Sequence, residues 1–132
     1  MINPTVSFNK MIEQADQSVT TLSVEQVADR IDQPGVILVD IRDIRELQRD
    51  GKIPGSKHIP RGMLEFWIHP ESPYYREYFN QCNELILHCN KGWRSALAAC
   101  TLENLGISAA HMEGGYNDWL SQGYPVEKSD QS

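Results

Sequence analysis

The sequence contains no apolar run that approaches the ~18 residues of a membrane-spanning helix. Its N-terminus also lacks the cationic start and the apolar stretch of a secretory signal. These two absences predict an intracellular, cytoplasmic protein without a membrane partner.

Cysteine is scarce, and no CxxC pair is present. Cys82, Cys89 and Cys100 are an odd number, which fits a reducing compartment better than a disulfide scaffold. Cys82 and Cys100 are expected to be ordinary packed residues, with a redox pairing between Cys82 and Cys89 as the alternative. The four histidines are scattered without zinc-type spacing, so we expect neither a metal site nor a cofactor.

Positively charged residues are also few: the chain has 12 lysines and arginines and 18 aspartates and glutamates, so its net charge is -6. An acidic protein is not expected to offer a broad surface to nucleic acid. Lys91 and Arg94 form a local basic exception. The 132 residues, 40% of them hydrophobic, predict one globular domain at 20–127, with an N-terminal helical extension at 1–19 and a polar tail at 128–132.

Short apolar runs alternate with helical patterns through most of the chain. The expected strands are 20–22, 36–39, 58–59, 84–87 and 109–112. The expected helices are 7–15, 23–31, 44–50, one that begins near Ser95 and includes 96–102, and 116–122. This alternation predicts an α/β fold in which right-handed crossovers build a parallel sheet with helices on both faces.

Three local patterns support these boundaries. Ser23 and Gln26 form a capping box, and Asp43 caps the helix that follows it. The pair Gly114-Gly115 predicts a close approach of two backbone segments.

An aromatic insert at 63–79 interrupts the alternation. It is expected to form one or two short helices anchored by Met63, Leu64, Phe66 and Trp67. Its role is left open.

The chemistry is expected in residues 88–95, His-Cys-Asn-Lys-Gly-Trp-Arg-Ser, which lie between an expected strand and an expected helix. Ligands of such sheets bind beyond the carboxyl ends of the strands, where backbone N–H groups and a helix N-terminus favour an anion. Cys89, with Lys91 and Arg94 beside it, is therefore the candidate thiolate nucleophile. His88 is expected to be a packed core residue, and no catalytic histidine is required.

Three stretches resemble the rhodanese domain family of sulfurtransferases. The first contains Asp40-Ile41-Arg42, Glu46 and the segment 51–60; the second is Cys89-x-x-Gly92-x-Arg94-Ser95; the third is 114–126, with G-G-x-x-x-W and G-x-P-V. They follow one another in the family's order and spacing. Lys52, where the family has His, and Ser56, where it often has Ala, are the departures. The resemblance implies a three-layer α/β fold with a central parallel sheet of about five strands.

The resemblance also implies a thiosulfate:cyanide sulfurtransferase-like enzyme. Cys89 would take a sulfane sulfur from thiosulfate or another small anionic donor, hold it as a persulfide, and pass it to a thiol, cyanide or protein acceptor. Asp40 and Arg42 are expected to support the shape of the site. The residues expected to bind the donor or the persulfide are Asn90, Lys91, Gly92, Trp93, Arg94 and Ser95.

Two alternatives stay open. Cysteine phosphatases and arsenate reductases also combine a strand, an anion-binding loop and a helix, and many begin with His-Cys. They place arginine six positions after the cysteine, whereas Arg94 follows Cys89 by five and Ser95 occupies the sixth position. The second alternative is a non-enzymatic binding or sulfur-relay module. Retention of Cys89, Gly92 and Arg94 argues against simple binding.

Overall fold

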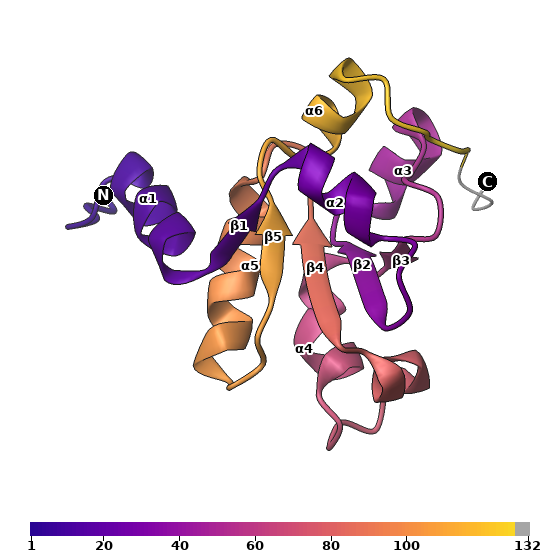
Figure 1. Cartoon of the computed structure of the whole chain (residues 1–132). Helices are drawn as coiled ribbons and strands as arrows, with labels where there is room; N and C mark the ends of the chain where they lie inside the picture. Colours follow the sequence, from indigo (N-terminus) through magenta and orange to yellow (C-terminus); the bar gives the residue numbers. More distant parts are fainter. Residues whose placement is uncertain (129–132) are drawn as a thin grey trace.

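A five-stranded parallel sheet lies at the centre of the computed structural model, which describes residues 1–128 (Figure 1). Its order is β1-β5-β4-β2-β3. The strands are β1 (Thr20–Leu22), β2 (Val36–Asp40), β3 (Lys57–His58), β4 (Glu84–His88) and β5 (Ala110–Met112). The predicted α/β fold with five parallel strands is confirmed.

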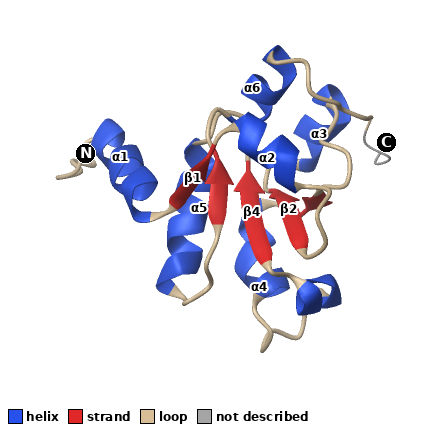
Figure 2. Ribbon diagram, viewed as in Figure 1, coloured by secondary structure: helices blue, strands red, loops and turns tan. Residues whose placement is uncertain are grey.

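Six helices surround the sheet and cover both of its faces (Figure 2). They are α1 (Phe8–Ser18), α2 (Val24–Arg30), α3 (Ile44–Asp50), α4 (Leu64–Ile68), α5 (Trp93–Asn104) and α6 (Gly115–Ser121), with 3-10 turns η1 (Arg61–Met63) and η2 (Glu77–Gln81). None of the helices within residues 1–128 has the length and apolar character needed to cross a membrane.

Strand β4 is buried on both faces because successive side chains of a strand point to opposite sides. Leu85 and Leu87 join the cluster formed with α4 and α5. Ile86 joins the opposite cluster, which contains Val27 of α2 and Trp119 of α6. The strand that precedes Cys89 is therefore packed on both of its faces.

The expected caps are present. Ser23 and Gln26 form a reciprocal capping box at the start of α2, and Asp43 forms one with Glu46 at the start of α3. Gly51, with φ of 86°, ends α3, as the sequence indicates. These local signals act within one turn of chain, so the rest of the fold does not override them.

Two sequence expectations are wrong in detail. Helix α5 begins at Trp93 rather than near Ser95, because Gly92 adopts the left-handed conformation (φ 99°) and turns the chain directly into the helix. Phe66 is not a packing anchor, since it is 54% exposed, and Ile68 takes that place with 5% exposure. The expected polar tail falls largely on residues 129–132, which lie outside the described residues.

The aromatic insert forms η1, α4 and η2, and its later part packs at the end of the sheet where β4 begins, opposite to the end where the loop after β4 starts (Figure 1). There it borders a cavity of about 220 Å³ whose lining includes Tyr75, Phe79, Cys82 and Leu85. The loop after β4 is thus left uncovered by this part of the insert.

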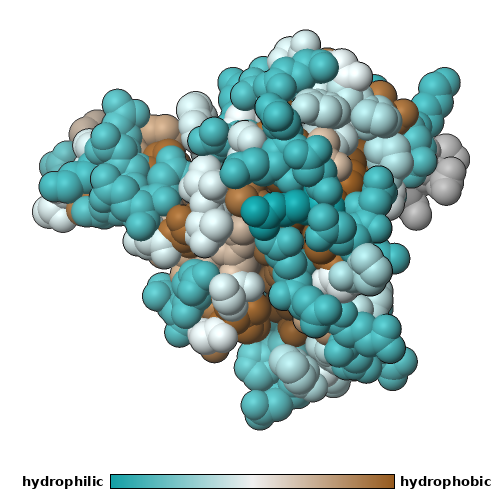
Figure 3. All heavy atoms as spheres, viewed as in Figure 1, coloured by the Kyte–Doolittle hydropathy of each residue, from teal (hydrophilic) through white to brown (hydrophobic). Residues whose placement is uncertain are grey.

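Hydrophilic residues cover most of the face in Figure 3, and apolar colour shows mainly in recesses between the elements.

Candidate active site

Cys89 directly follows β4 and is 1% exposed. The backbone N–H groups of Gly92 and Ser95 both donate to its Sγ, at 3.1 and 3.4 Å. Two amide dipoles directed at one buried sulfur favour negative charge on it. The predicted anion-favouring environment is therefore present at the predicted cysteine.

Hydrogen bonds from the first turn of α6 hold the loop that carries these amides. The N–H of Tyr116 donates to the Cys89 carbonyl at 2.8 Å, and that of Asn117 donates to the Asn90 carbonyl at 3.0 Å. Gly115 lies directly against the loop, so that a Cβ built on it would be 2.5 Å from the Asn90 carbonyl carbon. The close approach expected at Gly114-Gly115 is confirmed.

Arg94 forms an ion pair with Glu46. Its Nη1 and Nη2 donate to the two carboxylate oxygens of Glu46, at 2.7 and 3.0 Å. The guanidinium holds the pKa of Glu46 below its usual value mainly through these hydrogen bonds, against the opposing effect of burial. Any grip of Arg94 on an anionic donor must compete with this ion pair.

Lys91 and Trp93 form the outer side of the loop. The Lys91 Nζ lies 5.6 Å from the centroid of the Trp93 ring, and Trp93 is 49% exposed. The rings of Phe8 in α1 and Trp93 form an edge-to-face contact, with their centroids 5.2 Å apart. The N-terminal helix therefore reaches the active-site loop.

Asp40 and Arg42 form a fully buried ion pair behind the loop. Arg42 Nη2 donates to Asp40 Oδ2 at 2.8 Å and to the Gly51 carbonyl at 2.9 Å, and its guanidinium lies 4.1 Å from the centroid of the Tyr116 ring. Because Tyr116 also holds the Cys89 carbonyl, this pair supports the loop through α6.

His88 completes this buried cluster, with its Nε2 3.5 Å from Asp40 Oδ2. Burial by itself would raise the pKa of Asp40, but His88 and the hydrogen bonds from Arg42 hold that pKa below its usual value. Burial lowers the pKa of His88. Within residues 1–128, His88 Nε2 and Arg42 Nη1 are the buried side-chain polar atoms that lack a hydrogen-bond partner. The cluster is thus incompletely satisfied.

Ser95 connects the sulfur to a second histidine, which the sequence did not single out. The Cys89 Sγ lies 3.5 Å from Ser95 Oγ, and Ser95 Oγ lies 3.0 Å from His111 Nδ1. The other ring nitrogen of His111, Nε2, lies 3.0 Å from Asp16 Oδ1 on α1. No local motif joins these residues, because Asp16 and His111 are 95 positions apart.

The predicted site residues fall into three groups around Cys89. Gly92 and Ser95 direct N–H groups at its sulfur, whereas the side chains of Lys91, Trp93 and Arg94 are exposed. The Asn90 carbonyl and the buried pair Asp40 and Arg42 contact neighbouring elements instead of the sulfur. The part of the chain that is described contains no group of three His, Cys, Asp or Glu side chains arranged to hold a metal ion.

Relatives of the chain carry sulfur-transfer names. A mouse protein, "Thiosulfate sulfurtransferase/rhodanese-like domain-containing protein 3" from Mus musculus, is 31% identical over 101 residues, covering 72% of this chain and 64% of its own length. The chain thus spans slightly less than two thirds of that protein. The solution structure of the polysulfide-sulfur transferase homodimer from Wolinella succinogenes matches with a TM-score of 0.65 at 27% identity, covering 94% of this chain and 89% of that one.

A further solved structure is more similar and carries a different name. It is a protein of unknown function from Rhodopseudomonas palustris CGA009, described as a "Possible Tyrosine Phosphatase", with a TM-score of 0.87 and 42% identity. The match covers 96% of this chain and 98% of that chain. The sequence profile of the Rhodanese-like domain matches residues 23–122. Since that match spans most of the sequence, the protein belongs to the family of rhodanese-like domains.

Proposed function

We propose that the protein is a sulfurtransferase that carries a sulfane sulfur as a persulfide on Cys89. The observation that carries the proposal is the pair of N–H groups, from Gly92 and Ser95, that converge on Sγ at the end of β4. A persulfide is anionic, so the same amides would stabilise both the attacking thiolate and the loaded intermediate.

The reaction needs two displacements and no oxidant. The Cys89 thiolate attacks the outer sulfur of a donor such as thiosulfate; a sulfur–sulfur bond forms, the donor's own sulfur–sulfur bond breaks, and sulfite leaves with the electron pair. A thiolate or cyanide acceptor then attacks the outer sulfur of the persulfide and releases the Cys89 thiolate. Transfer through a covalent intermediate predicts ping-pong kinetics.

The surroundings of the loop suit an anionic donor and an acceptor of variable size. Lys91 adds positive charge to the outer side of the loop, next to the Arg94–Glu46 ion pair, in a chain whose net charge is -6. The later part of the aromatic insert packs at the opposite end of the sheet, so it does not restrict the acceptor. The names of the mouse and Wolinella proteins support sulfur transfer as the class of reaction.

Phosphatase or arsenate reductase activity is the second candidate, since the Rhodopseudomonas protein is described as a possible tyrosine phosphatase. Against it, Arg94 follows Cys89 by five positions instead of six, and its guanidinium is paired with Glu46 rather than directed at the sulfur. A shorter loop encloses a smaller anion, which favours a sulfane sulfur over a tetrahedral oxyanion.

Intact-mass measurement after incubation with thiosulfate or a low-molecular-weight persulfide tests the proposal. Wild-type protein should gain one sulfur atom, and cyanide should remove it as thiocyanate. Cys89→Ser should gain none, while Cys82→Ser and Cys100→Ser should behave as wild type. Absence of added mass with every donor would contradict sulfur transfer. Hydrolysis of an aryl phosphate that is lost in Cys89→Ser would establish the phosphatase instead.

A further inference from the structure

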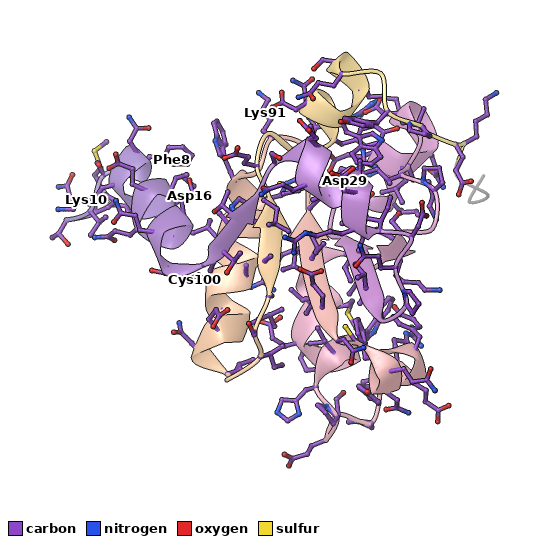
Figure 4. The ribbon with its side chains drawn as sticks, viewed as in Figure 1. Phe8, Lys10, Asp16, Asp29, Lys91 and Cys100 are labelled. Carbon is purple, nitrogen blue, oxygen red and sulfur yellow. The ribbon has the colours of Figure 1, made fainter. Side chains whose placement is uncertain are left out.

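A continuous line of contacts runs from the sulfur of Cys89 to the N-terminal helix. It passes from Sγ to Ser95 Oγ (3.5 Å), from Ser95 Oγ to His111 Nδ1 (3.0 Å), and from His111 Nε2 to Asp16 Oδ1 (3.0 Å). Ser95 and His111 are 0% and 1% exposed. Asp16 lies on the side of α1 that faces the body of the protein (Figure 4).

The chemistry of the partners fixes the direction of each hydrogen bond. An ionised carboxylate only accepts, so His111 Nε2 must carry the proton that it donates to Asp16. His111 Nδ1 then presents a lone pair, and the Ser95 hydroxyl donates to it. The Gly92 carbonyl is the other acceptor near that hydroxyl, at the longer distance of 3.3 Å. Ser95 Oγ is left to accept a proton from the thiol of Cys89.

We infer that Ser95, His111 and Asp16 form a proton relay that takes up the thiol proton of Cys89; its purpose, but not its existence, rests on the proposed sulfur transfer. The thiol proton moves to Ser95 Oγ while the hydroxyl proton moves to His111 Nδ1. The products are a thiolate and an imidazolium, the latter paired with the Asp16 carboxylate. Ser95 touches the reacting sulfur, whereas His111 and Asp16 are positioning residues that act through it.

The charged groups around the relay favour this transfer. Burial lowers the pKa of His111 and so opposes the transfer, whereas the charge and the hydrogen bond of Asp16 favour a proton on the ring. Asp16 from α1 and Glu113 after β5 are the acidic groups that act on His111. On the side of the sulfur, Arg94 of α5 is the cation that interacts with Cys89, and it is paired with Glu46 of α3.

The relay makes α1 part of the active site, although that helix lies outside the matched residues 23–122. The helix is held at two points beside the loop, by the Phe8 ring against Trp93 and by Asp16 at His111. Ala15 is its buried residue and anchors it between them. The extension therefore contributes a functional carboxylate as well as packing.

The pH dependence of Cys89 alkylation by iodoacetamide, a neutral reagent, tests the relay in the full-length protein, with the Cys89 peptide quantified by mass spectrometry. Asp16→Asn and His111→Gln keep side chains that form hydrogen bonds but remove the charge and the basic nitrogen. Each should raise the pH midpoint of alkylation by about one unit, the scale on which nearby cations act on thiols. The rate at high pH should remain that of wild type.

The sign of the shift is decisive. Simple repulsion between Asp16 and the thiolate predicts that Asp16→Asn lowers the midpoint, whereas the relay predicts that it rises. Glu13→Gln makes the same charge change at an exposed position of α1 and should not raise it. In the double variant Asp16→Asn/His111→Gln, the alkylation midpoint should shift no further than in His111→Gln alone. The reason is that Asp16 acts only through His111, so its loss has no further effect once His111 is replaced.

A lowered or unchanged midpoint in Asp16→Asn would overturn the relay. Should His111→Gln fail to fold, Asp16→Asn still decides, because the Asp16 side chain is 46% exposed. Alkylation needs no sulfur donor, so it is independent of the sulfur-loading experiment. A shifted midpoint without sulfur loading would keep the relay and reject the sulfurtransferase, and sulfur loading without a shift would do the reverse.

Discussion

Arg94 and Glu46 are 48 positions apart in the chain and share two hydrogen bonds, of 2.7 and 3.0 Å. Glu46 also accepts from the N–H of Asp43, at 3.2 Å, as the reciprocal half of the cap of α3. One carboxylate thus caps a helix and holds the arginine of the active-site loop. This dual use restrains the start of α5 and keeps a negative charge beside Arg94.

Replacement of Glu46 by Gln should improve donor binding. Gln still completes the cap of α3, but it no longer neutralises Arg94 or repels an anionic donor. A partly exposed ion pair is worth roughly 0.2–1 kcal/mol, so KM for thiosulfate should fall by a factor of about 1.4 to 5, with kcat little changed. Steady-state kinetics at low and high salt measure this effect, which should shrink at high salt.

Glu84→Gln is the matched control for this prediction. It removes the ion pair with Arg30 at the start of β4, the end of the strand away from Cys89. It should leave KM unchanged. An increase of KM in Glu46→Gln would mean that the ion pair orders Arg94 for donor binding instead of competing with it.

Loss of the Asp40 charge should destabilise the fold strongly. Asp40→Asn leaves the fully buried Arg42 guanidinium without its carboxylate, and removal of one partner of a buried ion pair costs about 3–5 kcal/mol. The free energy of unfolding, measured by urea denaturation, should fall by that amount. Asp50→Asn, which breaks an exposed pair with Arg49, should cause a much smaller loss. Equal losses would show that Asp40 and Arg42 are not the support of the loop.

Stability should decline as the pH falls below neutrality. Burial holds the pKa of His88 below the usual value, so the folded state resists its protonation. As the pH falls through about 6.5, the unfolded chain gains a proton on this residue that the folded protein does not. The free energy of unfolding therefore keeps its full value above that pH and should fall by up to about 1.4 kcal/mol per pH unit below it.

Urea denaturation between neutral pH and the mildly acidic range measures this slope. His88→Gln should reduce it, because glutamine does not titrate. The lowered pKa of Asp40 adds a further loss in the same direction, at pH values below the usual 3.8 of an aspartate. A wild-type protein whose stability is constant from neutral pH down to the mildly acidic range would contradict the prediction.

Insertion of a single methyl group at Gly115 should disable the loop. Gly115→Ala places a Cβ 2.5 Å from the Asn90 carbonyl carbon, so the backbone that holds Cys89 must move. Sulfur loading should drop sharply. Gly123→Ala is the control, because Gly123 has a similarly positive φ of 78° but open space around the added Cβ. It should lose stability, at a cost of about 1–2 kcal/mol, and retain loading.

Local patterns predicted most of the architecture correctly. The apolar run before Cys89, the caps at Ser23 and Asp43, and the glycines around α6 each specify structure within a few residues. The structure begins α5 earlier than the sequence pattern predicts, because the positive φ of Gly92 brings Trp93, Arg94 and Ser95 into the first turn. Phe66 was misplaced because an aromatic residue in a short helix can face either solvent or core.

Local patterns are sufficient to place a cysteine between a buried strand and a helix, because strand period, glycine and helix pattern are all encoded within a few residues. The ion pair of Glu46 with Arg94 and the contact of Asp16 with His111 follow from the packing of the whole chain. Those contacts depend on where α3 and α1 pack, and packing is set by the fit of distant apolar surfaces that no short motif records. The histidine of the relay therefore had no signal in the sequence, while the sulfur that it contacts through Ser95 had a clear one.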